Sequence, residues 1–117
     1  MRLRNWIGIC GVFISAAWPA AAVEPLTTRV TPRTAFAPVD VAIEAFIEPD
    51  ERNRLVAFEI DSGTFYAHSE LELEGERSAR IQFARFRMLP PGSYEVVVTL
   101  KGATGERARQ MRAVQLW

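Results

Sequence analysis

Residues able to perform covalent chemistry are few in this sequence. His68 is the only histidine, its nearest serines are Ser62 and Ser69, and the only cysteine, Cys10, lies in an apolar N-terminal run. Nucleophilic catalysis requires an activated Ser, Cys or Thr beside a base, and a metal centre requires several ligands at defined spacing. Because neither pattern is present, the sequence predicts a protein that is not an enzyme and that binds no cofactor.

Acidic residues form the other pattern with chemical potential. Glutamates recur at every second position, at Glu70, Glu72, Glu74 and Glu76. Carboxylate oxygens of this kind can bind calcium. The same spacing also describes an edge strand with a charged outer face, which deters edge-to-edge aggregation. We favour the charged outer face and keep calcium binding as the alternative.

The elements that must position these side chains are predicted to be strands. After residue 22, apolar residues recur with a period of two, and segments rich in Gly, Pro, Asn and Asp separate the apolar runs. Short strands at this spacing indicate an all-β sandwich or barrel. In one of them the alternation turns Ile81 and Phe83 towards the interior. The predicted strands cover residues 27–31, 39–47, 54–61, 64–69, 79–86, 93–100 and 107–116, with 70–74 as a weak strand or loop.

A turn followed by a tyrosine is the most specific motif. Leu89 begins the series Leu-Pro-Pro-Gly-Ser-Tyr, in which Gly92 precedes Tyr94 by two residues, and an alternating strand follows. This motif resembles the corner of bacterial immunoglobulin-like (fibronectin type III-like) domains, where a tyrosine hydroxyl bonds back to the main chain. The resemblance implies a single antiparallel β-sandwich of seven or eight strands over residues 23–117.

The same resemblance implies a core without a disulfide. Family members with a disulfide carry the second cysteine two residues after the corner tyrosine, together with a buried tryptophan on another strand. Apolar residues stand at the matching positions of this chain. The implied core residues are Val41 or Ile43, Phe58, Val96 and Val98.

The N-terminus predicts export. Arg2 and Arg4 precede an apolar run over residues 6–18, and three alanines end at Ala22. This order is typical of a cleaved secretory signal peptide, and the run is shorter than the roughly 20 residues of a spanning helix. We therefore expect a signal peptide over residues 1–22 and a mature domain over 23–117 without a membrane span, periplasmic in a Gram-negative bacterium or secreted.

The charge of the mature domain argues against nucleic acid as a partner. Residues 23–117 contain twelve basic and fourteen acidic side chains, a net charge of −2. A sign-mixed surface of this kind lacks the basic footprint that phosphate backbones require.

Three hypotheses for function remain, of which an enzyme is the least favoured. The first is a module that binds another envelope protein, either through an exposed aromatic face or through the edge strand 64–69, with Phe65 or Tyr66 as the anchor beside His68. We expect Ala67→Pro to weaken an edge contact without unfolding the domain. The alternative is a module for a small ligand, either carbohydrate or calcium, that uses Tyr66, Trp117 and the glutamates of residues 70–76.

Overall fold

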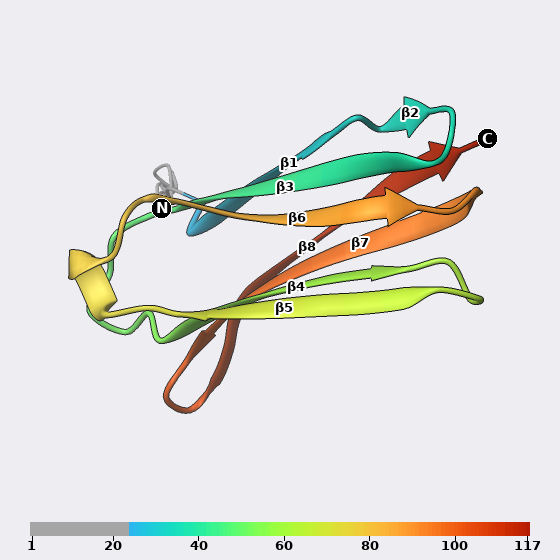
Figure 1. Ribbon diagram of the computed structural model, residues 1–117. Helices are drawn as coiled ribbons and strands as arrows, with labels where there is room; N and C mark the ends of the chain where they lie inside the picture. The colour runs from blue at the N-terminus through green and yellow to red at the C-terminus, as the bar shows by residue number, and fades with distance from the viewer. Residues whose placement is uncertain (1–23) are drawn as a thin grey trace, which may run out of the picture.

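The chain folds into two facing β-sheets (Figure 1). The computed structural model describes residues 24–117, so the predicted signal peptide lies outside the described residues. Within that range there is no α-helix, only a single 3-10 turn, η3 (Gly75–Arg77), and the predicted all-β class is confirmed. The strands are β1 (Leu26–Thr31), β2 (Thr34–Ala35), β3 (Val39–Ile47), β4 (Leu55–Asp61), β5 (Tyr66–Glu72), β6 (Ile81–Leu89), β7 (Gly92–Gly102) and β8 (Gly105–Leu116).

The strands divide unequally between the sheets. Sheet I has the order β1-β3-β6, and sheet II has the order β2-β8-β7-β4-β5. All neighbours are antiparallel except the short β2, which runs parallel to the end of β8. In this sandwich-like arrangement β5 is the outer strand of sheet II, and it lies below β4 in Figure 1.

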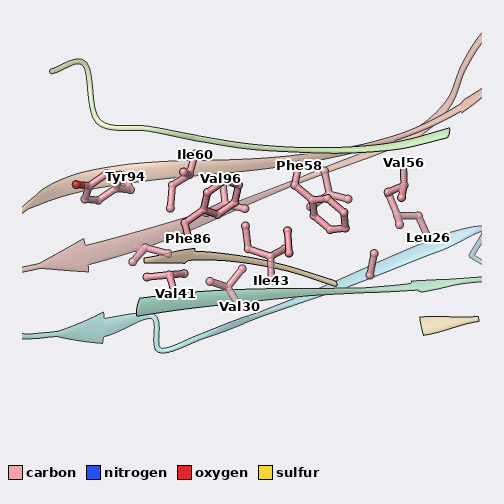
Figure 2. Packing of buried hydrophobic residues seen from close by; sticks show 14 of the residues in the cluster. Leu26, Val30, Val41, Ile43, Val56, Phe58, Ile60, Phe86, Tyr94 and Val96 are labelled. Atoms are coloured by element: carbon pink, nitrogen blue, oxygen red, sulfur yellow. The ribbon is translucent and has the colours of Figure 1, made fainter. Parts of the chain in front are cut away.

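Side chains that alternate along the strands fill the space between the sheets. Ile43, Phe58, Val96 and Val98 are fully buried, and Figure 2 shows Ile43 and Phe58 pointing towards each other from opposite sheets. Period-2 alternation sends every second residue of each strand inward, and each buried aliphatic or aromatic side chain contributes about 1.5–3 kcal/mol. The resemblance puts Val96 and either Val41 or Ile43 at the positions of the disulfide, and Phe58 in the place of the buried tryptophan.

The turn between β6 and β7 is held by the tyrosine that marks it in the sequence. The Tyr94 hydroxyl donates a hydrogen bond of 2.7 Å to the carbonyl oxygen of Pro90, and Leu89 is fully buried beside it. Gly92 has a φ of +157°, a backbone conformation that L side chains rarely adopt, and a Cβ there would make only an ordinary contact of 3.4 Å with the side chain of Ser62. The backbone conformation therefore favours glycine at this position.

β6 differs from its predicted alternation. Ile81 and Phe83, expected inside, are 51% and 60% exposed, whereas Ala84 and Phe86 are buried. Apolar residues occupy both faces of this strand, so period two alone does not select a face. The ladder with β3 decides, because Ala84 opposes the fully buried Ile43.

A polar network closes the end of the molecule where the β3–β4 loop, η3 and the β7–β8 hairpin meet. Asn53, only 1% exposed, donates to the carbonyl oxygen of Glu48 and accepts from the Arg107 guanidinium, while its own carbonyl accepts from the Gly75 amide. Arg107 also reaches the Asp50 carboxylate at 3.2 Å. A buried amide with each polar group paired fixes these loops relative to one another.

Candidate functional site

The candidate site is the outer edge of β5. This strand pairs only with β4, and Tyr66 opposes Asp61 at one end of the ladder while Glu72 opposes Leu55 at the other. The strand starts two residues later than predicted and absorbs part of the segment that was expected to be a weak strand or loop. Among the described residues no other strand covers its far side, so one row of main-chain donors and acceptors is open to solvent.

The bonds that flank β5 show which of its residues face the open edge. The Ser62 amide donates to the carbonyl of Phe65 at 2.9 Å, and the Leu73 amide donates to the carbonyl of Arg54 at 2.8 Å. Residues of an antiparallel strand alternate between facing the partner and facing away. The odd-numbered residues of β5 therefore bond to β4, and the even-numbered residues direct their N–H and C=O groups outward.

This alternation corrects the expectation for Ala67. Its amide faces Ile60 on β4, so a proline there removes a bond inside sheet II rather than at the open edge. His68 is the adjacent residue whose amide faces outward, and a proline at His68 is therefore the substitution that blocks the edge alone.

Of the two predicted anchors, only Tyr66 is on the surface. Phe65 packs against the core and meets the Tyr94 ring edge-on, with 6.3 Å between ring centroids. Tyr66 is 54% exposed, its hydroxyl donates to a Glu59 carboxylate oxygen at 2.7 Å, and its ring lies 5.9 Å from that of His68. The hydrogen bond to Glu59 raises the pKa of the Tyr66 phenol, because ionisation would remove the donated proton.

The acidic segment is divided between two elements. Glu70 and Glu72 are exposed on the outer face of β5, whereas Glu74 precedes η3 and Glu76 lies within it. No group of three or more His, Cys, Asp or Glu side chains suited to a metal ion occurs within residues 24–117. The alternative of calcium binding therefore gains no cluster of ligands from the described residues.

The aromatic side chains do not form one face. Phe36 and Trp117 are 81% and 62% exposed beside each other, where Ala35 and Ala37 bond to the main chain of Trp117. Tyr66 lies at the opposite border of sheet II, and Phe86 is buried. The pair of Tyr66 and Trp117 proposed for a carbohydrate thus falls on opposite edges.

A smaller apolar patch covers the outer face of sheet I, and it includes Ile81, which sequence reasoning placed inside. Phe46 opposes Ile81 there, and a surface hollow of 480 Å³ lies over both. The Arg29 guanidinium lies 5.7 Å from the centroid of the Phe46 ring and is paired with Glu44 at 2.9 Å. Cation–π and ion-pair contacts therefore cover part of this patch.

Comparison with known proteins finds likeness in solved structures only. No family model matches the chain, and no curated protein matches it. A superoxide reductase (neelaredoxin) from Ignicoccus hospitalis is similar over 80% of this chain and 81% of its own, at 7% identity and a TM-score of 0.59. The soluble domain of PmoD from Methylocystis sp. is similar over 79% of this chain and 90% of its own, at 11% identity and a TM-score of 0.55.

A third similar structure is a much longer chain. A family 76 glycoside hydrolase from a bovine Bacteroides thetaiotaomicron strain matches 80% of this chain with 20% of its own length, at 13% identity and a TM-score of 0.55. At these identities the likeness shows a shared all-β fold.

These neighbours correct one prediction from the sequence. The lack of a familiar catalytic pattern around His68 led to the prediction that the chain is not an enzyme. That prediction is contradicted, because similar structures of this fold include the superoxide reductase. A shared fold does not assign an activity to this chain. The lack of a familiar catalytic motif in the sequence does not exclude an activity either.

Proposed function

We propose that this chain is an exported protein-interaction module of the bacterial envelope, built on an immunoglobulin-like sandwich, with the β5 edge as its contact surface. In this proposal residues 1–22 are a cleaved signal peptide and residues 23–117 form the working domain in the periplasm of a Gram-negative bacterium. The two-sheet order, with β1, β3 and β6 facing β8, β7, β4 and β5, supports the immunoglobulin-like topology. The bond from Tyr94 to Pro90 supports it further.

The observation that carries the proposal is the open main-chain edge of β5. Tyr66, His68, Glu70 and Glu72 each direct a donor and an acceptor away from sheet II, beside an exposed aromatic ring. Strand addition to such an edge gains affinity from main-chain bonds and specificity from alternate side chains. Because Glu70 and Glu72 line the outer face, the favoured partner is an extended segment with basic side chains at every second position.

Within residues 24–117 no helix has the length and apolar character needed to cross a membrane.

The test is capture from a solubilised envelope extract with the full chain as bait, followed by identification of the bound protein. His68→Pro should abolish capture, because it removes an outward-facing amide and fills the edge with the proline ring. Arg85→Pro is the matched control. The Ile47 amide donates to the carbonyl of Arg80, which shows that the even-numbered residues of β6 bond to β3. The odd-numbered Arg85 therefore directs its amide to the open edge of sheet I.

Retained capture by a folded His68→Pro variant would refute the proposal. Loss of capture by Arg85→Pro but not by His68→Pro would move the contact to β6. Far-UV circular dichroism and a thermal melt on each variant establish that the fold is intact.

A further inference from the structure

Sheet II has a second open edge, on β8. β2 pairs only with Gln115 and Leu116, so among the described residues no strand is hydrogen-bonded to residues 105–113 of β8 on that side, although part of β1 approaches β8. The open part of β8 is long enough to accept the seven residues of β5. The two borders of one sheet are thus both unpaired.

The main-chain bonds give the phase of this second edge. The Gln115 amide donates to Arg33 at 2.9 Å and the Trp117 amide donates to Ala35 at 3.0 Å, both on the β2 side. By the alternation of antiparallel strands, Arg109, Met111 and Ala113 also direct their N–H and C=O groups to this side. The open residues are even-numbered on β5 and odd-numbered on β8.

The ladders of sheet II bring these two sets into the same rows. Glu70 opposes Ala57, Ala57 opposes Thr99, and Thr99 opposes Arg109. The same reading places His68 in one row with Met111, and Tyr66 in one row with Ala113. A second copy shifted sideways along the sheet would therefore set its β5 against β8 of the first, antiparallel and in register.

In that register, the outward-facing residues of β5 from Tyr66 to Glu70 each lie opposite an outward-facing residue of β8. The pairs Tyr66–Ala113, His68–Met111 and Glu70–Arg109 direct main-chain groups at each other, so each can exchange two hydrogen bonds. The inner faces bring Leu71 beside Ala108. The new pairing stops at Ala113, before Gln115 and Leu116 of β8, which already pair with β2.

The charges of the side chains favour pairing of β5 with β8 over pairing of β5 with β5 or of β8 with β8. Pairing two β5 edges would gather the exposed Glu70 and Glu72 of both copies along one junction, and pairing two β8 edges would gather Arg109 and Arg112 of both. Like charges on opposite strands are destabilising, whereas opposite charges stabilise. The pairing of β5 with β8 sets Glu70 against Arg109.

From this complementarity we propose that β8 of a second copy of the chain occupies the β5 edge, so that molecules join head to tail into a continuous sheet. The inference rests on the proposed function, namely that β5 accepts an added strand. Because the two joined surfaces differ, the contact is heterologous and each added copy leaves one β5 and one β8 edge free. The product is an open chain rather than a closed dimer.

One side chain competes with this contact. The Arg112 guanidinium donates at 2.8 Å to the carbonyl of Met111, which faces the open edge, and at 3.2 Å to the Gln110 side chain. In the isolated molecule Arg112 therefore covers one acceptor that the added strand needs. Arg112→Ala should strengthen self-association, because it frees that carbonyl.

Sedimentation velocity over a range of protein concentrations, with the full chain, tests the proposal. The wild type should form species larger than a dimer at high concentration and low salt. His68→Pro and Met111→Pro should each abolish these species. Glu70→Arg and Arg109→Glu should each weaken association by up to about fivefold, the upper range for a cross-strand charge pair, and the double variant or a mixture of the single variants should restore it.

A disulfide reports the register directly. Ser69→Cys and Gln110→Cys, combined with Cys10→Ser, place one cysteine on each border of sheet II, separated within one molecule by three strand spacings, about 14 Å. A bond between them can form only between molecules. Oxidation should yield a ladder of multimers, whereas the two cysteines placed at Ser69 and Ala113 should not react.

The outcomes separate this inference from the function on which it rests. A wild type that stays monomeric at all concentrations, or a dimer that persists in both proline variants, would overturn self-association. If His68→Pro then still loses capture of an envelope protein, the proposed function stands and only the second copy is excluded. If Met111→Pro loses self-association and retains capture, both stand.

Discussion

Two neighbouring prolines provide the sharpest test of how β5 is oriented. Ala67 and His68 are adjacent; the Ala67 side chain is half-buried and packs against the edge of the core, and the His68 side chain is exposed. The structure nevertheless predicts opposite results, because the Ala67 amide faces Ile60 on β4 and the His68 amide faces solvent.

The magnitude follows from the groups left without partners. Ala67→Pro removes a main-chain bond, a loss of about 0.5–1.5 kcal/mol, and leaves the carbonyl of the fully buried Ile60 unsatisfied, a further loss of about 1–3 kcal/mol. The free energy of unfolding should thus fall by about 1.5–4.5 kcal/mol. His68→Pro leaves no buried group unpaired, so its cost should stay below about 1 kcal/mol.

Urea denaturation followed by tryptophan fluorescence and circular dichroism measures both values, and a constant m-value confirms that the same surface is exposed on unfolding. Ser69→Pro should behave like Ala67→Pro, since it has the same phase. If His68→Pro destabilises the fold as much as Ala67→Pro, the assigned phase is wrong and the proposed edge contact has no basis.

Further predictions concern the core, the corner, the loop network and the N-terminus. Phe58→Ala should lower the free energy of unfolding by about 3–5 kcal/mol, since the ring is fully buried, and a loss below about 1 kcal/mol in urea would contradict its core position. Tyr94→Phe should lose about 1 kcal/mol with the bond to Pro90, measured in the same way. Hydrogen bonds from Arg52 hold the pKa of the Asp50 carboxyl well below its usual 3.8, so its stabilisation is present above that value and lost as the pH falls below it. The stability difference between wild type and Asp50→Asn should therefore shrink in acid, as a series of melts from neutral pH downward would show. Intact mass of the exported protein should place the mature N-terminus at or near Val23, and recovery of the uncleaved chain from the cytosol would refute export.

Strands with one apolar and one polar face were predictable from the sequence. β3 has the predicted bounds because its inward positions, from Val41 to Ile47, are all apolar and its outward positions include Asp40 and Glu44. β6 was not predictable to the same degree, because both of its faces carry large apolar side chains, Ile81 and Phe83 on one and Phe86 on the other. Only the pairing with β3 shows which face is buried.

The candidate site divides in the same way. The sequence placed an edge strand near Tyr66 and His68 and left open which of two adjacent aromatic rings is exposed. The direction of each amide depends on the bond between Ser62 and Phe65 in the β4–β5 turn, and side-chain periodicity carries no information about it. The pairing rows across sheet II likewise depend on three ladders that only the folded chain defines.

The network around Asn53 has a consequence for how the molecule opens. Its side chain and carbonyl tie together the β3–β4 loop, η3 and the β7–β8 hairpin, so none of these segments can detach without breaking the bonds of the others. Amide hydrogens of Asn53 and Gly75 should therefore exchange with solvent deuterium together, in one cooperative opening. The outward amides of His68 and Glu70 have no such coupling and should exchange orders of magnitude faster. Amide exchange should thus be slow at the end of the molecule around Asn53 and fast along the β5 edge, where an added strand would bind.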